Sequence, residues 1–214
     1  MKLHRRGWRS WRDTAFAVLD FETTGLDPAR DHVLSYGVVR VEGGRVRLAG
    51  SLYRIVRPPV LLPPASIRVH GIRPADLEDA PLLGDVVDEL DDALDGRTLV
   101  AHAAWVELGF LGRLRALHGG LDFRSAIDVL DLAEELAARD PGAPVPRTAR
   151  LPELAACHEV PVARTHHAFA DALTTAQLFV VLATRLERLG AGGLRHLTQA
   201  RRSQFARTFA TAAP

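Results

Sequence analysis

Apolar runs and turn residues in the first quarter of the chain predict three β-strands. Residues 16–19, Phe-Ala-Val-Leu, form a short apolar run that ends at Asp20 before a Thr-Thr-Gly turn. This pattern is typical of a buried strand with polar residues at its end. Residues 33–41 and 46–56 are rich in strand-forming side chains, and a Glu-Gly-Gly segment at 42–44 separates them. The two runs therefore predict a β-hairpin.

The rest of the chain predicts helices that alternate with short strands. Four prolines between residues 58 and 64 predict an ordered loop without regular structure. Residues 82–94 carry apolar side chains at helical spacing and an acidic outer face, so we expect an amphipathic helix there. Short strands are expected at 98–101 and 126–127, and helices at 105–117, 129–138, 151–158 and 168–189.

The predicted order is β-β-β-α-β-α-β-α-α, which indicates a mixed α/β fold. One hydrophobic sheet with helices on its faces is the simplest architecture that buries all of these elements. Ligands of such sheets bind at strand ends, near a switch in strand order. The polar residues that directly follow the first strand are therefore well placed for a functional site.

Asp20 and Glu22 flank Phe21 at the end of this first strand. Residues i and i+2 of a strand project from the same face, so both carboxylates are expected to point one way while Phe21 enters the core. Two close carboxylates repel each other unless a cation or a proton intervenes. A metal site and a solvated strand end are both compatible with this pair taken alone.

Two further clusters lie at predicted helix starts. His102 and Glu107 occupy a strand-to-helix junction, where the helix dipole favours an acid in the first turn. His166 and Asp171 are five residues apart at the entry to the long helix, a spacing at which they can meet if His166 lies on the preceding loop. Helix-start acids and exposed loop imidazoles explain these residues equally well when each is taken singly.

Together, the three clusters resemble the motifs of the DEDDh (DnaQ-like) 3′–5′ exonucleases, a family that includes the polymerase III proofreading subunit. Residues 16–26 resemble the first motif, residues 100–111 the second, and residues 166–172 the third, with its His five residues before the Asp. The resemblance covers about residues 14–188. It implies an RNase H-like exonuclease fold with a central mixed five-stranded sheet flanked by helices.

The second motif departs from the family pattern, which reads His-Asn-Ala-x-Phe-Asp. Here Ala103 replaces the Asn, Val106 the Phe and Glu107 the Asp. Glu carries the same charge on a stem one methylene longer, so it can still serve a metal directly or through water. The loss of the Asn removes a polar group from the neighbourhood of the substrate.

The resemblance implies hydrolysis of a phosphodiester bond with two divalent ions, and oxygen ligands favour Mg²⁺ or Mn²⁺. By this resemblance Asp20 bridges both ions, Glu22 and Asp171 hold the ion that activates water, and Glu107 serves the second. His166 is the implied general base, because a neutral imidazole near pH 7 can accept the proton of water.

Four residues are candidates for binding the terminal nucleotide. Thr23, Leu26 and His102 fall within the first two motifs, and His70 lies in the segment 67–72, which also resembles the family. Turn former, core leucine and strand-end histidine are the alternative interpretations of the first three. The sequence offers no groove-reading chemistry, so weak base preference is expected.

Composition places the chain among ordinary globular proteins. It has 214 residues, 47% of them hydrophobic, with no apolar run near the roughly 18 residues of a membrane span. A single cysteine, Cys157, and the lack of a secretory signal suit a reducing cytoplasm, so we expect a cytoplasmic protein with no membrane partner.

The net charge of +1 hides an uneven distribution. Residues 1–12 and 188–214 each carry five basic residues and no acid, so the acids concentrate in the middle of the chain. We expect a basic arm at 1–13, an exonuclease domain at 14–189 and a basic tail at 190–214. The arm and the tail could contact phosphates, with Trp8 and Trp11 stacking on bases, or could be solvated or pack on the domain.

The expected partner is the 3′ end of a nucleic acid, DNA before RNA, in proofreading or repair, with a DNA polymerase as a possible associate. Two alternatives stay open. One is an RNA-trimming exoribonuclease of the same fold. The other is a nucleic-acid- or polymerase-binding module whose catalysis has weakened through changes in its second motif.

Overall fold

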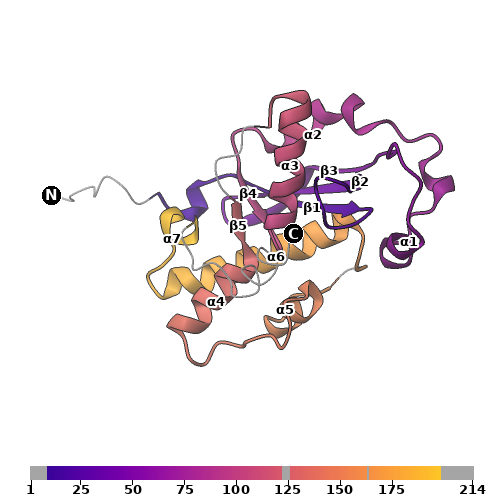
Figure 1. Ribbon diagram of the computed structural model, residues 1–214. Coiled ribbons are helices and arrows are strands. Elements are labelled where there is room, and N and C mark those ends of the chain that lie inside the picture. Colours follow the sequence, from indigo (N-terminus) through magenta and orange to yellow (C-terminus); the bar gives the residue numbers. More distant parts are fainter. Residues whose placement is uncertain (1–8, 122–125, 163, 199–214) are drawn as a thin grey trace.

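The structure is a computed structural model that describes residues 9–121, 126–162 and 164–198. Its centre is a five-stranded sheet in the order β3-β2-β1-β4-β5 (Figure 1). The strands are β1 (Phe16–Thr23), β2 (Val33–Glu42), β3 (Arg45–Ile55), β4 (Thr98–Ala101) and β5 (Ala126–Asp128). The first three strands pair antiparallel, whereas β4 and β5 run parallel to β1. The predicted mixed sheet is confirmed.

Helices cover both faces of the sheet, as Figure 1 shows. On one face lie α4 (Val129–Arg139), α5 (Leu151–Cys157) and the long α6 (Ala168–Arg188). On the other lie α2 (Val87–Leu94) and α3 (Trp105–His118). Alternate residues of β1 supply the two cores, because neighbouring strand residues point to opposite faces.

The long helix α6 is apolar and long enough to cross a membrane by length and composition. In the structure its side chains fill the core instead: Leu178, Phe179 and Leu182 are fully buried. Phe179 stacks at a tilt on Phe16 of β1, with ring centroids 4.7 Å apart. The helix is thus the main packing partner of the sheet.

The start of α6 approaches the sheet closely at Gly37 of β2. A Cβ atom at Gly37 would lie 2.5 Å from the carbonyl carbon and oxygen of Ala168 and from the Cα of Phe169. Only a residue without a side chain allows this contact. The absence of a side chain at this position therefore sets how near the first turn of α6 comes to the central strands.

The proline-rich segment has no regular structure at 58–63, as predicted, but a helix that was not predicted, α1 (Pro64–His70), begins at the last of its four prolines. Pro63 is the N-cap and Pro64 is the first helical residue, a position that proline tolerates since its missing N–H would have no partner there. The helix ends at Gly71 in a left-handed conformation. The prolines start this helix rather than prevent it.

The amphipathic helix predicted from residue 82 begins later. Leu83–Asp85 form a turn of 3₁₀-helix, η3, and a further 3₁₀ turn, η2, spans Pro74–Leu77. Val86 has φ of −127°, which breaks the helical path, so α2 starts at Val87. Periodicity in the sequence runs through this break because the apolar side chains on both sides of it face the same core.

Parts of the predicted arm and tail pack on the domain and on each other. The 3₁₀ turn η1 (Trp11–Asp13) and α7 (Leu194–Thr198) lie together, with the N–H of Leu194 donating to the Arg9 carbonyl at 3.0 Å. Trp11 is fully buried against Phe179 and is therefore a core residue rather than a stacking platform. Trp8 and most of the tail lie outside the described residues, and the boundaries at 13 and 190 stay a prediction.

Candidate active site

Three carboxylates meet where the end of β1 faces the first turn of α6. Each of Asp20, Glu22 and Asp171 offers an oxygen, and these oxygens all lie within 4.8 Å of one another. Between the two strand residues, Phe21 turns to the opposite face and packs edge-on against Phe110, with centroids 6.1 Å apart. The strand alternation that the sequence predicts is what brings the two β1 carboxylates to one side.

The electrostatics of this group favour a bound cation. Burial, followed by repulsion from Glu107, Asp171 and Glu22, holds the pKa of Asp20 well above its ordinary value. Burial and the charge of Asp171 raise the pKa of Glu22 to about 8. No ion pair within the described parts of the chain includes any of the three carboxylates. Hard oxygen donors in a partly buried cluster of carboxylates are the donor set that a divalent cation takes.

Glu107 stands beside this group, in the first turn of α3. Its side chain is only 3% exposed, and its Oε2 is buried without a hydrogen-bond partner among the residues that the structure describes. Burial is the main cause that raises the pKa of Glu107, and its charge in turn raises the pKa of Asp20. A buried carboxylate oxygen with no donor is a costly arrangement that a cation would relieve.

His166 meets Asp171 through its backbone. The N–H of His166 donates to Oδ2 of Asp171 at 2.9 Å, and the residue adopts a left-handed φ of 57° on the loop that precedes α6. The imidazole itself is exposed. The bent loop thus leaves this side chain beside the carboxylates and open to a ligand.

A cavity of about 290 Å³ adjoins the carboxylates on the β3 side. Tyr53 and His167 stack within it, with ring centroids 4.5 Å apart. His70 is 5% exposed, and its Nδ1 accepts the N–H of Ile72 at 2.9 Å. In the neutral ring Nε2 then carries the proton, and it has no partner in the described part of the chain. The lining comprises Glu22, Ser35, Tyr53, Ile55, His70, Gly71, Ile72, Asp76, Arg164, His166 and His167.

The remaining nucleotide-binding candidates differ in availability. Thr23 donates its hydroxyl to the Gly25 carbonyl at 2.6 Å, which is the turn-forming role. Leu26 is 60% exposed, so it is not a core leucine and its side chain is free for an apolar contact. His102 Nε2 donates to the Ala149 carbonyl at 2.7 Å, so its ring is fixed in orientation.

Sequence reasoning missed the Tyr53–His167 stack and the buried carboxylate of Asp128. The stack joins residues more than a hundred positions apart, and nothing in the local pattern of either segment indicates the contact. Asp128 ends β5 and receives hydrogen bonds from backbone N–H groups at 103, 104 and 130. Its one signal in the sequence is its position directly before a helix, which is typical of an N-cap.

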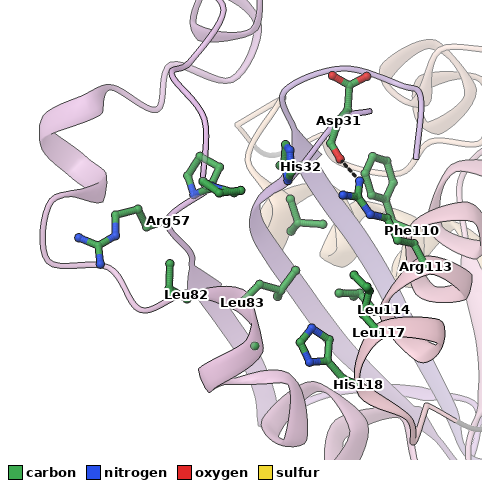
Figure 2. A pocket seen from close by; sticks show the side chains of 14 residues that line it. Asp31, His32, Arg57, Leu82, Leu83, Phe110, Arg113, Leu114, Leu117 and His118 are labelled. Carbon is green, nitrogen blue, oxygen red and sulfur yellow. Dashed lines mark hydrogen bonds between the residues drawn. The ribbon is translucent and has the colours of Figure 1, made fainter. Parts of the chain in front are cut away.

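A second cavity, of about 270 Å³, lies away from the carboxylates, between α3 and the segments around residues 57–59 and 82–84 (Figure 2). Its lining is largely apolar, with Leu83 and Leu114 facing its interior (Figure 2). Arg113 at its edge donates to the main-chain carbonyls of Pro28 and Asp31, both at 2.8 Å. None of the four carboxylates and not His166 lines this cavity, so the candidate chemistry belongs to the first one.

Comparison with known proteins decides the family. The model of the RNase_T family, described as exonuclease, matches residues 17–179, which is more than half of the chain. The chain belongs to this exonuclease family. The resemblance read from the three sequence motifs is confirmed at this level, and the matched region of the RNase_T exonuclease domain contains all four carboxylates and His166.

Relatives and solved structures agree with this assignment. The RNase_T domain is 28% identical over 186 residues to the 3′–5′ exonuclease DinG of Staphylococcus haemolyticus, covering 86% of this chain and 20% of DinG. It is 31% identical over 179 residues to a PolC-type DNA polymerase III of Thermotoga maritima, covering 83% of this chain and 12% of that protein. The chain therefore spans a fifth or less of the length of these two relatives.

The fold matches that of solved exonucleases. Escherichia coli exonuclease I in complex with a dT13 oligonucleotide superposes with a TM-score of 0.70 at 17% identity, over 83% of this chain and 42% of that chain. Exonuclease X in complex with 5′ overhanging duplex DNA gives a TM-score of 0.64 at 20% identity, over 86% of this chain and 98% of that chain. The predicted RNase H-like exonuclease fold is confirmed.

Proposed function

We propose that the protein is a metal-dependent 3′–5′ exonuclease that removes nucleoside monophosphates from the 3′ end of single-stranded or frayed DNA. The observation that carries the proposal is the partly buried carboxylate cluster of Asp20, Glu22 and Asp171, with the buried Glu107 beside it. Membership of the exonuclease family supports the reaction class. The names of the relatives, a 3′–5′ exonuclease and a DNA polymerase, support the direction of attack and DNA as the polymer.

The donor set fits Mg²⁺ or Mn²⁺, since all of its members are carboxylate oxygens. Asp20, Glu22 and Asp171 would hold one ion, and Asp20 with Glu107, whose Oε2 has no partner, would hold a second. When bound, such ions supply the positive charge that offsets charge on the attacking and leaving oxygens of a phosphodiester.

The chain's own residues account for the remaining steps. The exposed imidazole of His166 takes a proton from the attacking water, whose oxygen bonds to phosphorus. The bond from phosphorus to the 3′-oxygen of the preceding nucleotide breaks, and this oxygen takes a proton from solvent to become a hydroxyl. The products are a nucleoside 5′-monophosphate and a strand shortened by one residue. The hydrogen bond from the His166 N–H to Asp171 keeps the loop of this base against the carboxylates. The exposed Leu26 offers the terminal base an apolar surface, and the Nε2–H of His70 offers a donor in the adjoining cavity.

Digestion of matched oligonucleotides tests the proposal. DNA and RNA 20-mers of one sequence, labelled at the 5′ end or at the 3′ end, are incubated with Mg²⁺, with Mn²⁺ or with a chelator. We expect a ladder of shortened 5′-labelled DNA and early release of the 3′ label, in either metal and not in chelator. Faster digestion of RNA would instead indicate an exoribonuclease, and binding without digestion would indicate a binding module.

A matched pair of variants ties the activity to the carboxylates. Asp20→Ala removes the most central carboxylate and is expected to abolish digestion, whereas Asp92→Ala removes an exposed acid on α2 and is expected to leave it unchanged. Full activity in Asp20→Ala would refute the proposed site. The relation to PolC further suggests a DNA polymerase as a partner in proofreading, which co-purification with a replicative polymerase would test.

A further inference from the structure

Asp128 connects two parts of the molecule that both flank the carboxylate site. It ends β5, precedes α4, and has a carboxylate that is 7% exposed. Three backbone N–H groups donate to this carboxylate, two from the loop between β4 and α3 and one from α4. Burial is the main cause that raises the pKa of Asp128, and these three N–H groups act in the opposite direction, because they stabilise the charged carboxylate.

The two oxygens of Asp128 accept different hydrogen bonds. Oδ1 accepts from Leu130 at 2.9 Å, which caps α4, and from Ala103 at 3.2 Å. Oδ2 accepts from Ala104, at 2.9 Å. Capping of α4 thus depends on one oxygen, whereas holding the loop at 103–104 depends on both.

The loop at 103–104 needs such an acceptor because its conformation is unfavourable. Ala103 has a left-handed φ of 55°, which is costly for a residue with a Cβ other than Asn or Asp. Ala104 is the N-cap of α3, yet it has no side chain that could cap the helix. The carboxylate of Asp128 is the external group that satisfies both N–H donors.

The residues on either side of this loop belong to the candidate site. His102 precedes it, with its ring held by the Ala149 carbonyl. Glu107 follows in the first turn of α3, so the position of its carboxylate beside Asp20 depends on how the helix starts. A shift of the loop would move both side chains.

We propose that Asp128 is a positioning residue of the active site, which locks the 102–104 loop and thereby places Glu107 against Asp20 and His102 beside the substrate. Asp128 contacts neither substrate nor metal in this role. The inference rests on the proposed function, since it concerns the same carboxylate site. It assigns a task to a side chain outside the three exonuclease motifs.

The substitution Asp128→Asn separates positioning from capping. Asn is as good an N-cap as Asp, so its amide oxygen keeps the bond to Leu130 and with it the stability of α4. With the amide oxygen at that position, the NH₂ group faces the N–H of Ala104, whereas the reverse orientation would lose the bonds to both Ala103 and Leu130. Either way, at least one loop N–H loses its acceptor.

Asp91→Asn is the matched control. Asp91 lies on α2, on the opposite face of the sheet from α4, and its Oδ1 accepts the N–H of Leu121 at 2.7 Å. The change is the same carboxylate-to-amide exchange at a bond to a loop N–H, far from the carboxylate cluster. It therefore measures the general cost of the exchange.

The experiment compares thermal unfolding, kcat and KM on a 5′-labelled DNA 20-mer, and calorimetric titration with Mn²⁺. We expect Asp128→Asn to unfold at the temperature of Asp91→Asn, to lower kcat by about 10- to 100-fold, and to weaken Mn²⁺ binding by a similar factor. Asp91→Asn should match the wild type in kcat and in Mn²⁺ affinity.

Two results overturn the inference: wild-type kcat and Mn²⁺ affinity in Asp128→Asn, or a loss of kcat that appears only with a lowered unfolding temperature. A purely structural role predicts the latter and leaves Mn²⁺ binding intact in the folded fraction. Failure of the proposed function looks different, because the wild type itself would then release no nucleotide with any metal.

Discussion

The two halves of β1 lie in one strand and have opposite surroundings. Phe16 and Val18, in the first half, are fully buried among apolar side chains of α4, α5 and α6. Asp20 and Glu22, in the second half, are carboxylates with raised pKa values and no ion pair among the described residues. The first half lowers the free energy of the folded state, and the second half raises it until a cation binds.

Helix α6 likewise has an acidic residue at the candidate site in its first turn and an apolar part in the core. Its first turn carries Asp171, and two turns later Phe179 packs on Phe16 and Trp11. The core and the site therefore share their two main elements. Packing in one half of each element therefore fixes the positions of groups that repel each other in the other half, which is how a preorganised site is maintained.

Among changes that keep the shape of the side chain, the largest effect is expected from Glu22→Gln, which removes a charge from the polar half of β1. Activity should fall on the order of a hundred- to a thousandfold, as for the loss of one preorganised charged group in an active site. Unfolding of the metal-free protein should at the same time shift to higher temperature, because one source of repulsion is gone. A variant that loses both activity and stability would contradict the division within β1.

The converse change belongs in the apolar half. Phe179→Ala should lower the free energy of unfolding by about 3–5 kcal/mol, since Phe179 is fully buried between Phe16 and Trp11. Activity per folded molecule should stay near the wild-type value. Chemical denaturation and a digestion assay measure the two quantities, and Val18→Ala, a smaller deletion in the same core, serves if Phe179→Ala does not fold.

Repulsion in the polar half of β1 should also make the stability of the metal-free protein depend on pH. The pKa of Glu22 is raised to about 8, so between pH 4.5 and pH 8 the folded state holds a proton that the unfolded state has lost. The metal-free protein should therefore lose stability as pH rises through this window. We expect a loss of up to about 5 kcal/mol, or roughly 10–20 °C in melting temperature for a chain of this length.

Melting curves in chelator between pH 5 and pH 8 measure this loss. Mn²⁺ should remove most of the slope, because the ion stabilises the ionised carboxylates, and Glu22→Gln should flatten the curve without metal. An apo protein whose melting temperature rises with pH over the same window would argue against repulsion in the cluster.

The smallest effect is expected at Ala103. Ala103→Gly relieves a left-handed conformation but adds backbone freedom to the unfolded chain, so the net gain in unfolding free energy should be below about 1 kcal/mol. Differential scanning calorimetry resolves a change of this size. A destabilised variant would mean that the hydrogen bonds to Asp128 do not hold the loop once the Cβ is removed.

Much of the fold follows from local pattern. The apolar run at 16–19, the hairpin glycines Gly43 and Gly44 with their positive φ values, and the long apolar helix α6 are all readable in the sequence. Helix α1 is not, because proline disfavours regular structure everywhere except in the first turn of a helix. Helix α7 escapes prediction since its five residues become ordered through packing against the segment at residue 9.

The candidate site was predictable only as separate motifs. Alternation in β1 places Asp20 and Glu22 together, but their approach to Asp171 depends on how α6 crosses the sheet. The three motifs were predicted to form one site because together they resemble a family, and no local property of the sequence requires that they meet. Asp128 and the Tyr53–His167 stack lie outside the motifs and depend on long-range contacts, which one sequence does not encode in any local pattern.

Gly37 has no side chain that could take part in a reaction, yet it determines the distance between the sheet and the first turn of α6, across which the carboxylates face each other. A methyl group at this position would collide with the backbone of Ala168 and lift the first turn of α6, with Asp171, away from β1. The distance between the candidate carboxylates therefore depends on the absence of a side chain at a position in β2, a strand to which none of these carboxylates belongs. Inherited changes at such a position would register as enzyme defects, although the altered residue touches neither metal nor substrate.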